Sequence, residues 1–100
     1  MAKLSKAQER TLQKIRERYD EAIERSLRYY TEHIQNPDKY ETPQMIEHYK
    51  ENLEYVKKGF MLWQSGNSRT LERLAEEGFI EYIKKDGIRF TPIDWVKLIK

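Results

Sequence analysis

Two long segments in which apolar residues recur at the helical period constrain the fold of this 100-residue chain more than any other feature. In the first segment the intervals between apolar residues are three or four and average close to the helical repeat. It comprises Leu12, Ile15, Tyr19, Ile23, Leu27, Tyr30 and Ile34. In the second segment the intervals alternate between three and four, as they do in a heptad seam. It comprises Ile46, Tyr49, Leu53, Val56, Phe60 and Trp63. The pattern predicts two amphipathic helices, each with an apolar face that needs a partner.

Capping residues mark the two ends of the first helix. Ser5, with Gln8 three residues later, fits a capping box and predicts a helix from about Lys6 to Ile34. Asn36-Pro37 ends this helix, because proline disfavours helical geometry in the residue before it. The helix is long for so small a chain, so a break near Asp20 to Arg25 is the alternative to one continuous element.

The second helix has its own start and stop residues. Thr42 is the predicted N-cap and Pro43 the first helical residue, where the missing N–H of proline costs nothing. Gly66 is the predicted residue just beyond its end. The short connection from Asn36 to Thr42 predicts an antiparallel hairpin with the first helix. The alternative is a coiled-coil contact with a second copy of the chain.

Residues 66–100 combine a third, short helix with segments that are rich in strand formers. Asn67 or Ser68 caps the helix and Gly78 ends it. An Asp-Gly pair then marks a tight turn between two strands, and Thr91-Pro92 repeats the pattern of a capping residue followed by proline. The predicted order is a helix over 68–77, a strand over 79–83, a turn over 84–87, a strand over 88–90 and a final helix after Thr91 that includes Ile93, Val96 and Leu98 or Ile99.

This order, and the residues from Ser68 to Ile80 in particular, resembles a winged helix-turn-helix of the MarR type and of related small bacterial and phage regulators. The segment has a small polar start, Thr70 followed by an apolar residue, a leucine three positions later, and then Gly78 with two apolar residues. Phe90-Thr91-Pro92 fits the step that opens the last helix of such domains. The expected fold is therefore α+β and mainly helical, as a single domain of residues 1–100. A long helical hairpin (5–64) is expected to join a C-terminal winged helix-turn-helix (66–100) with a two-stranded wing.

The resemblance implies that the chain binds double-stranded DNA as a small transcriptional or phage or mobile-element regulator, acting as a dimer. In such a domain a short helix enters the major groove while basic wing residues neutralise phosphates. The expected contacts on helix 68–77 and on the wing are Ser68, Arg69, Thr70, Arg73, Lys84, Lys85 and Arg89.

A second hypothesis treats the chain as an adaptor or inhibitor, encoded by a phage or mobile element, that binds a host protein through the helical hairpin. Its basis is the apolar run from Phe60 to Trp63, together with a charge balance of 19 basic against 17 acidic residues. The expected protein-contact residues are Tyr55, Met61 and Leu62. Met61 and Leu62 lie outside the main apolar stripe of the helix, where they either cover the winged-helix part or mark a partner surface.

Composition argues against several other classes. The chain has no cysteine, and its two histidines, His33 and His48, are too few for a metal site without further ligands. Apolar runs are too short to span a membrane, and residues 1–8 lack the apolar core of a signal peptide, so a cytoplasmic location is expected. No glycine-rich phosphate loop and no marked pair of carboxylates indicates catalysis. The sequence thus predicts no enzyme, cofactor or metal.

Overall fold

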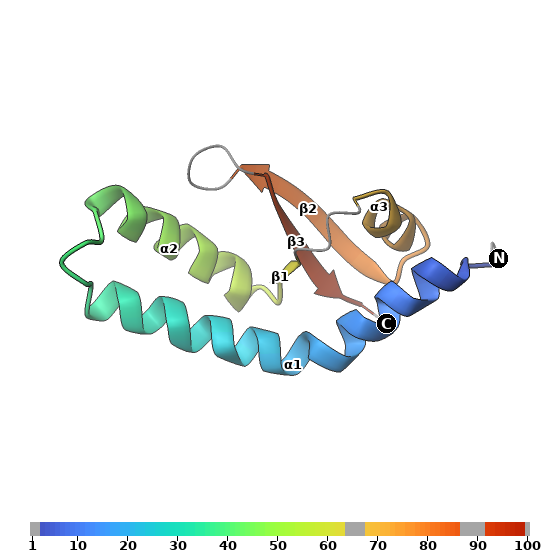
Figure 1. The fold of residues 1–100 in the computed structure, drawn as a ribbon, viewed down its shortest axis with the longest axis horizontal. Coiled ribbons are helices and arrows are strands. Elements are labelled where there is room, and N and C mark those ends of the chain that lie inside the picture. The colour runs from blue at the N-terminus through green and yellow to red at the C-terminus, as the bar shows by residue number, and fades with distance from the viewer. Residues whose placement is uncertain (1–2, 64–67, 87–91, 100) are drawn as a thin grey trace.

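A computed structural model describes residues 3–63, 68–86 and 92–99, except the side chains of residues 86 and 92. Its elements are α1 (Lys6–Gln35), α2 (Pro43–Lys57), β1 (Met61–Trp63), α3 (Ser68–Glu76), β2 (Ile80–Asp86) and β3 (Pro92–Leu98). The chain is α+β and mainly helical, as predicted. It is elongated, with principal extents of 50 × 26 × 17 Å, because α1 runs along its whole length (Figure 1).

Helix α1 begins at the predicted capping box. The Ser5 hydroxyl accepts a hydrogen bond from the Gln8 backbone N–H at 3.2 Å, and the Gln8 side chain accepts one from the Ser5 N–H at 2.9 Å. The helix then continues without a break to Gln35. Ion pairs of Arg25 with Glu21 and of Arg28 with Glu24 lie across the segment where a break was the alternative. Acid-before-base pairs at this spacing stabilise a continuous helix.

Helix α2 also begins as predicted, and it lies antiparallel to the C-terminal half of α1 (Figure 1). The Thr42 hydroxyl accepts a hydrogen bond from the Met45 N–H at 3.2 Å, and Pro43 is the first helical residue. Tyr30 of α1 and Val56 of α2 are both buried in the contact between the two helices. The apolar stripe of α2 is therefore covered by α1 of the same chain.

The predicted end of the second helix at Gly66 is wrong, because α2 ends at Lys57. Gly59 follows with a φ of +99°, a left-handed conformation that glycine adopts most easily. The Gly59 N–H donates to the carbonyl of Val56 at 2.9 Å, and the Phe60 N–H donates to the carbonyl of Tyr55 at 3.0 Å. These two bonds form a Schellman motif, which satisfies the last carbonyls and turns the chain into β1.

Replacing Gly59 with alanine is expected to lower the free energy of unfolding by about 1–3 kcal/mol. An L-residue is strained at this φ, and the new Cβ would lie 3.1 Å from the hydroxyl oxygen of Tyr19, which donates a hydrogen bond to the Gly59 carbonyl. Urea denaturation of the variant and of the natural chain measures the difference. An unchanged denaturation midpoint would contradict this account of how α2 ends.

The three strands form one antiparallel sheet in the order β1-β3-β2. The strand β2 begins at Ile80, one residue later than the predicted strand over 79–83, and continues to Asp86. The predicted turn is therefore wrong for residues 84–86, which pair with β3. The predicted final helix after Thr91-Pro92 is wrong, since residues 92–98 form the central strand β3. Proline is accommodated as the first residue of this strand, a position that sheets tolerate. The predicted turn residue Gly87 and the predicted strand over 88–90 lie outside the described residues.

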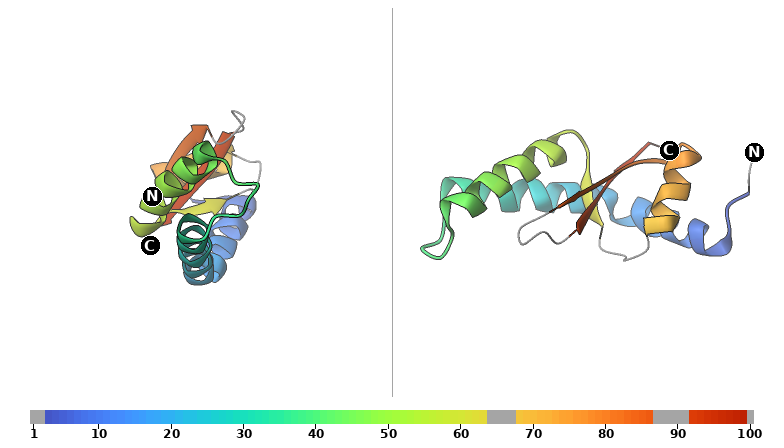
Figure 2. Two further views of the ribbon diagram at one scale, coloured as in Figure 1. Left: turned by 90° about the vertical axis from the view of Figure 1, so that its left-hand side faces the viewer. Right: turned by 90° about the horizontal axis from the view of Figure 1, so that it is seen from above.

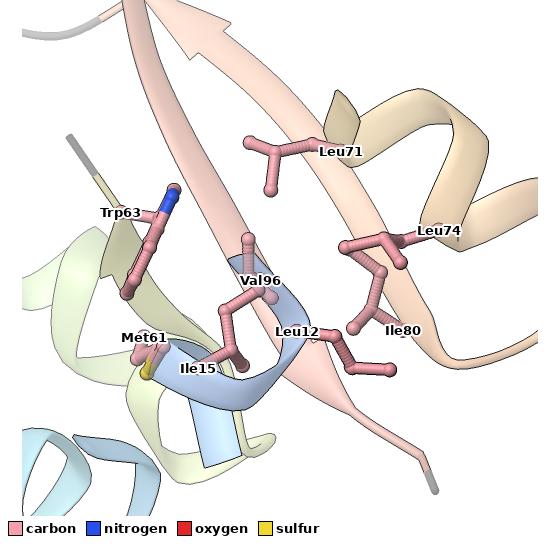
Figure 3. Close-up of a cluster of buried hydrophobic side chains, with 8 residues drawn as sticks. All are labelled: Leu12, Ile15, Met61, Trp63, Leu71, Leu74, Ile80 and Val96. Carbon is pink, nitrogen blue, oxygen red and sulfur yellow. The ribbon is translucent and has the colours of Figure 1, made fainter. Parts of the chain in front are cut away.

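Each face of the sheet packs against a different apolar cluster. The α3 cluster joins the N-terminal half of α1 to the sheet and to α3 (Figure 3), and consists of Leu12, Ile15, Met61, Trp63, Leu71, Leu74, Ile80 and Val96. The hairpin cluster joins α1, α2 and the other face, and its buried members are Tyr30, Val56, Phe60 and Trp95. Adjacent residues of β3, Trp95 and Val96, thus belong to different clusters. The central strand β3 therefore contributes side chains to both clusters and connects them.

The arrangement shares only part of the predicted winged helix-turn-helix. Helix α3 is followed by the antiparallel pair β2 and β3, as a helix followed by a wing requires. A helix-turn-helix needs two consecutive helices joined by a short turn. Here the strand β1 lies between α2 and α3. The winged-helix assignment of residues 66–100 therefore stays a prediction.

Candidate nucleic-acid interface

Helix α3 is held with one face against the core and the other in solvent. Leu71 and Leu74 are fully buried in the α3 cluster, while Arg69 and Glu72 are exposed. Figure 2 shows that α3 lies beside the N-terminal half of α1, away from α2. The helix ends as predicted at Gly78, whose φ is +81° and whose N–H donates to the carbonyl of Ala75. The buried leucines and this helix end fix which face of α3 is turned to solvent.

The first residues of α3 are only partly available to a ligand. Arg69 is exposed and forms no ion pair within the part of the chain that the structure describes, and Ser68 is half-buried. Thr70 is 7% exposed. Its side chain therefore offers little surface to a base or phosphate, and its role as a DNA contact stays a prediction. The turn of the helix places Thr70 beside the buried Leu71.

Two of the predicted cations are already paired with carboxylates. Arg73 lies 3.0 Å from Glu77 and 3.4 Å from Glu76, both on or just beyond α3. Lys85 lies 3.3 Å from Glu51 of α2, and its ammonium sits 4.9 Å from the centroid of the Tyr55 ring. Desolvation lowers the pKa of Lys85, but the hydrogen bond and charge of Glu51 raise it, and the net shift is upward. Lys85 points toward α2, on the opposite face of the sheet from α3.

Lys84 lies on the face of the sheet that carries α3. Side chains alternate along a strand, so Lys84 shares the face of Tyr82, which packs against the α3 cluster. Lys84 is exposed and forms no ion pair among the described residues. Its cross-strand neighbour is Asp94, whose carboxylate accepts a hydrogen bond from the Tyr82 hydroxyl at 2.7 Å. The predicted contact Arg89 lies outside the described residues.

Carboxylates near Tyr82 reduce the positive potential of this face. Burial is the main cause that raises the pKa of Tyr82, and the hydrogen bond to Asp94 and the charges of Asp94 and Glu72 raise it further. Both acidic groups therefore lie close enough to the Tyr82 hydroxyl to act on it. Among the predicted cations that the structure describes, Arg69 and Lys84 are exposed and form no ion pair with a described residue, and they have acidic neighbours.

The predicted protein-contact residues lie in or against the core. Met61 is 1% exposed: it belongs to the strand β1, not to the predicted helix, and its side chain points into the α3 cluster, so it offers almost no surface to a partner and its expected role stays a prediction. Leu62 packs partly buried against the hairpin cluster. Tyr55 is half-buried and stacks on Trp95, with ring centroids 5.3 Å apart. These residues cover the chain's own core.

The two histidines do not meet. His33 pairs instead with Glu41, whose carboxylate oxygen lies 2.5 Å from the His33 Nδ1 and whose side chain is 8% exposed. This pair, with the ring of Tyr29 at 4.3 Å from that of His33, fastens the connection between α1 and α2 to the end of α1. Across residues 3–63, 68–86 and 92–99, no group of three or more His, Cys, Asp or Glu side chains is arranged to hold a metal.

A third set of cations was missed by the sequence reasoning. Residues 3–18 carry six basic side chains and two acidic ones, and the rest of the chain carries 13 basic and 15 acidic. Three of the six, Lys6, Arg10 and Lys14, recur every fourth residue and are exposed. That four-residue spacing is visible in the sequence and predicts one helical face.

No protein-family model, curated protein or solved structure matches this chain. Among the helices of the described residues, none is both long and apolar enough to cross a lipid bilayer. The function must therefore be argued from the arrangement of the side chains themselves.

Proposed function

We propose that this protein binds duplex DNA with the exposed face of α3 and the neighbouring strand β2. The observation that carries the proposal is that Arg69 of α3, and Lys84 on the face of the sheet that carries α3, are exposed and form no ion pair with a described residue. The resemblance of residues 68–80 to a winged helix supports the same surface. The finer proposal is a winged-helix regulator of a phage or mobile element that acts as a dimer.

The physical basis is neutralisation of DNA phosphates. Each Lys or Arg that contacts a phosphate releases a condensed counterion, which makes binding weaken as salt rises. Arg69 sits at the second residue of α3, where its guanidinium can reach a phosphate or the edge of a guanine. Lys84 supplies a second charge from the sheet. With Glu72 and Asp94 nearby, this surface is expected to make few phosphate contacts and to bind with modest affinity.

The test replaces the two unpaired cations, as R69Q/K84Q, and follows backbone amides by NMR during titration with a short duplex. The natural chain should show shifts in α3 and β2, with an affinity for that surface that falls about tenfold between about 50 and 200 mM salt. In R69Q/K84Q the salt dependence should nearly vanish. Each cation that contacts a phosphate contributes about one unit to the slope of log affinity against log salt concentration.

The matched control is R73Q/K85Q, which removes the same charge from two cations that already have carboxylate partners. The control should retain the salt dependence of the α3 surface. Loss of binding in the control with retention in R69Q/K84Q would overturn the assignment of the contacts. An absence of duplex-induced shifts in α3 and β2 of the natural chain would overturn the proposed function.

A further inference from the structure

Three exposed cations form a stripe along the first turns of α1. Lys6, Arg10 and Lys14 follow one another at intervals of four residues, which places them on one side of the helix over about 12 Å of its axis. Leu12 and Ile15 are buried in the α3 cluster and lie roughly 170° around the axis from the centre of this stripe. The stripe, hereafter the α1 stripe, faces away from the core and from α3.

The three cations of the α1 stripe form no ion pair within the described chain, and the one carboxylate on their side of these first turns, Glu17, lies at the far end of the stripe, three residues after the last cation. Arg25 and Arg28 further along the same helix are instead paired with Glu21 and Glu24. Like charges four residues apart repel each other and weaken a helix. The two halves of α1 therefore have different surfaces: the N-terminal half has an excess of unpaired cations, whereas both arginines of the C-terminal half lie in ion pairs.

The cations of the stripe also interact unfavourably with the dipole of α1, because they lie at its N-terminal end. The first turns of a helix carry a partial positive charge, so acidic residues stabilise that end and basic residues destabilise it. Lys6 is the first residue of α1 and Arg10 follows one turn later. The stability of α1 comes instead from the capping box at Ser5 and from the buried Leu12 and Ile15. Helix stability gives no reason for cations at these places.

We infer that the α1 stripe is a second surface for duplex DNA, which contacts phosphates without reading the base sequence. Duplex DNA presents one negative charge for about every 1.7 Å of its axis, so a stripe of about 12 Å can face several phosphates. The rigid helix holds the three charges in a row. The net charge of the whole chain is only +2, so this local excess is what can attract a polyanion.

The inference rests on the proposed function for the choice of duplex DNA as the ligand. The side chains that it assigns to DNA contact are different ones. Because the α1 stripe faces away from α3, the two surfaces contact separate stretches of DNA. The chain can then hold two duplex segments at once.

The test uses the variant K6Q/R10Q/K14Q and NMR titration of the full chain with a short duplex of random sequence. In the natural chain the amides of α1 from Lys6 to Lys14 should shift, with an affinity for that surface that falls about 40-fold between about 50 and 200 mM salt. In the variant these shifts should disappear, while the shifts of α3 and β2 remain. The thermal midpoint should be unchanged or higher, because repulsion within the helix is relieved.

The matched control is R25Q/R28Q/K57Q, which removes three cations that have carboxylate partners. It should leave the titration of the α1 stripe unchanged. If the triple stripe variant keeps its α1 shifts and their salt dependence, the inference is wrong and the proposed function stands. If the α1 shifts depend on the stripe but α3 and β2 never respond, the inference stands and the proposed site is wrong. Equal binding of a single strand or of an acidic polypeptide would contradict a duplex surface.

Discussion

Trp95→Ala is expected to lower the free energy of unfolding by about 3–5 kcal/mol, the range for removing a large aromatic side chain from a core. Trp95 is 1% exposed and lies in β3, the central strand of the sheet. Its ring stacks on Tyr55 of α2 at 5.3 Å with an interplanar angle of 23°. The side chain therefore joins the sheet to the helical hairpin, and its loss leaves a cavity between them.

Urea denaturation followed by circular dichroism measures the effect of Trp95→Ala. Ile99→Ala is the matched control, because Ile99 lies just beyond the end of the same strand and is 50% exposed. The control should change the free energy of unfolding by no more than about 0.5 kcal/mol. A similar, small change in both variants would mean that the sheet and the hairpin do not share a core at Trp95.

Met61→Ala has the second large expected effect, a loss of about 2–5 kcal/mol in the free energy of unfolding. Met61 is 1% exposed and packs with Ile15 of α1 and Val96 of β3 in the α3 cluster (Figure 3). A surface residue that contacts a partner would give a much smaller change in the isolated chain. The same denaturation experiment thus separates a core methionine from a protein-contact methionine. If Met61→Ala keeps the full stability of the natural chain, Met61 is not a core residue and a role in contacting a partner protein is favoured.

The ends of the helices could largely be predicted from local chemistry. Ser5 with Gln8, Thr42 with Pro43, and Gly78 act through hydrogen bonds to residues three to five positions away, so the sequence alone contains the information. The apolar faces followed from the helical period. Such signals depend on near neighbours and are not changed by how the rest of the chain packs.

The predicted end of α2 was wrong because apolar residues of the following strand happen to continue the helical spacing of α2. Phe60 and Trp63 continue the spacing of the helical stripe, but they lie beyond Gly59 in an extended segment. In that segment successive residues point to opposite sides, so Met61 and Trp63 join the α3 cluster while Phe60 joins the hairpin cluster. A short apolar segment that is buried on both faces has no period that distinguishes strand from helix.

The same ambiguity affected β3. Trp95 and Val96 are adjacent and both fully buried, because the central strand has an apolar cluster on each side. A strand covered on both faces lacks the alternation of apolar and polar residues that identifies a half-exposed strand. Thr91-Pro92 then favoured a helix start, although proline is equally acceptable as the first residue of a strand.

The candidate site could be predicted only in part, since its charges depend on distant neighbours. The pairing of Arg73 with Glu77 follows from their spacing on one helix, but the pairing of Lys85 with Glu51 joins residues 34 positions apart. Burial of Thr70 likewise depends on how α3 docks. The α1 stripe needed no fold to be noticed, because its four-residue spacing defines a helical face.

The central claim is that unpaired cations on α3, β2 and α1 bind duplex DNA, and a residue-by-residue NMR titration of the natural chain tests it most directly. With a short duplex at about 50 and 200 mM salt, two separate sets of amides should shift, one in α1 from Lys6 to Lys14 and one in α3 and β2 around Arg69 and Lys84. Both sets should require more duplex at the higher salt concentration. Shifts confined to other residues, or shifts that are equally strong at both salt concentrations, would contradict the claim.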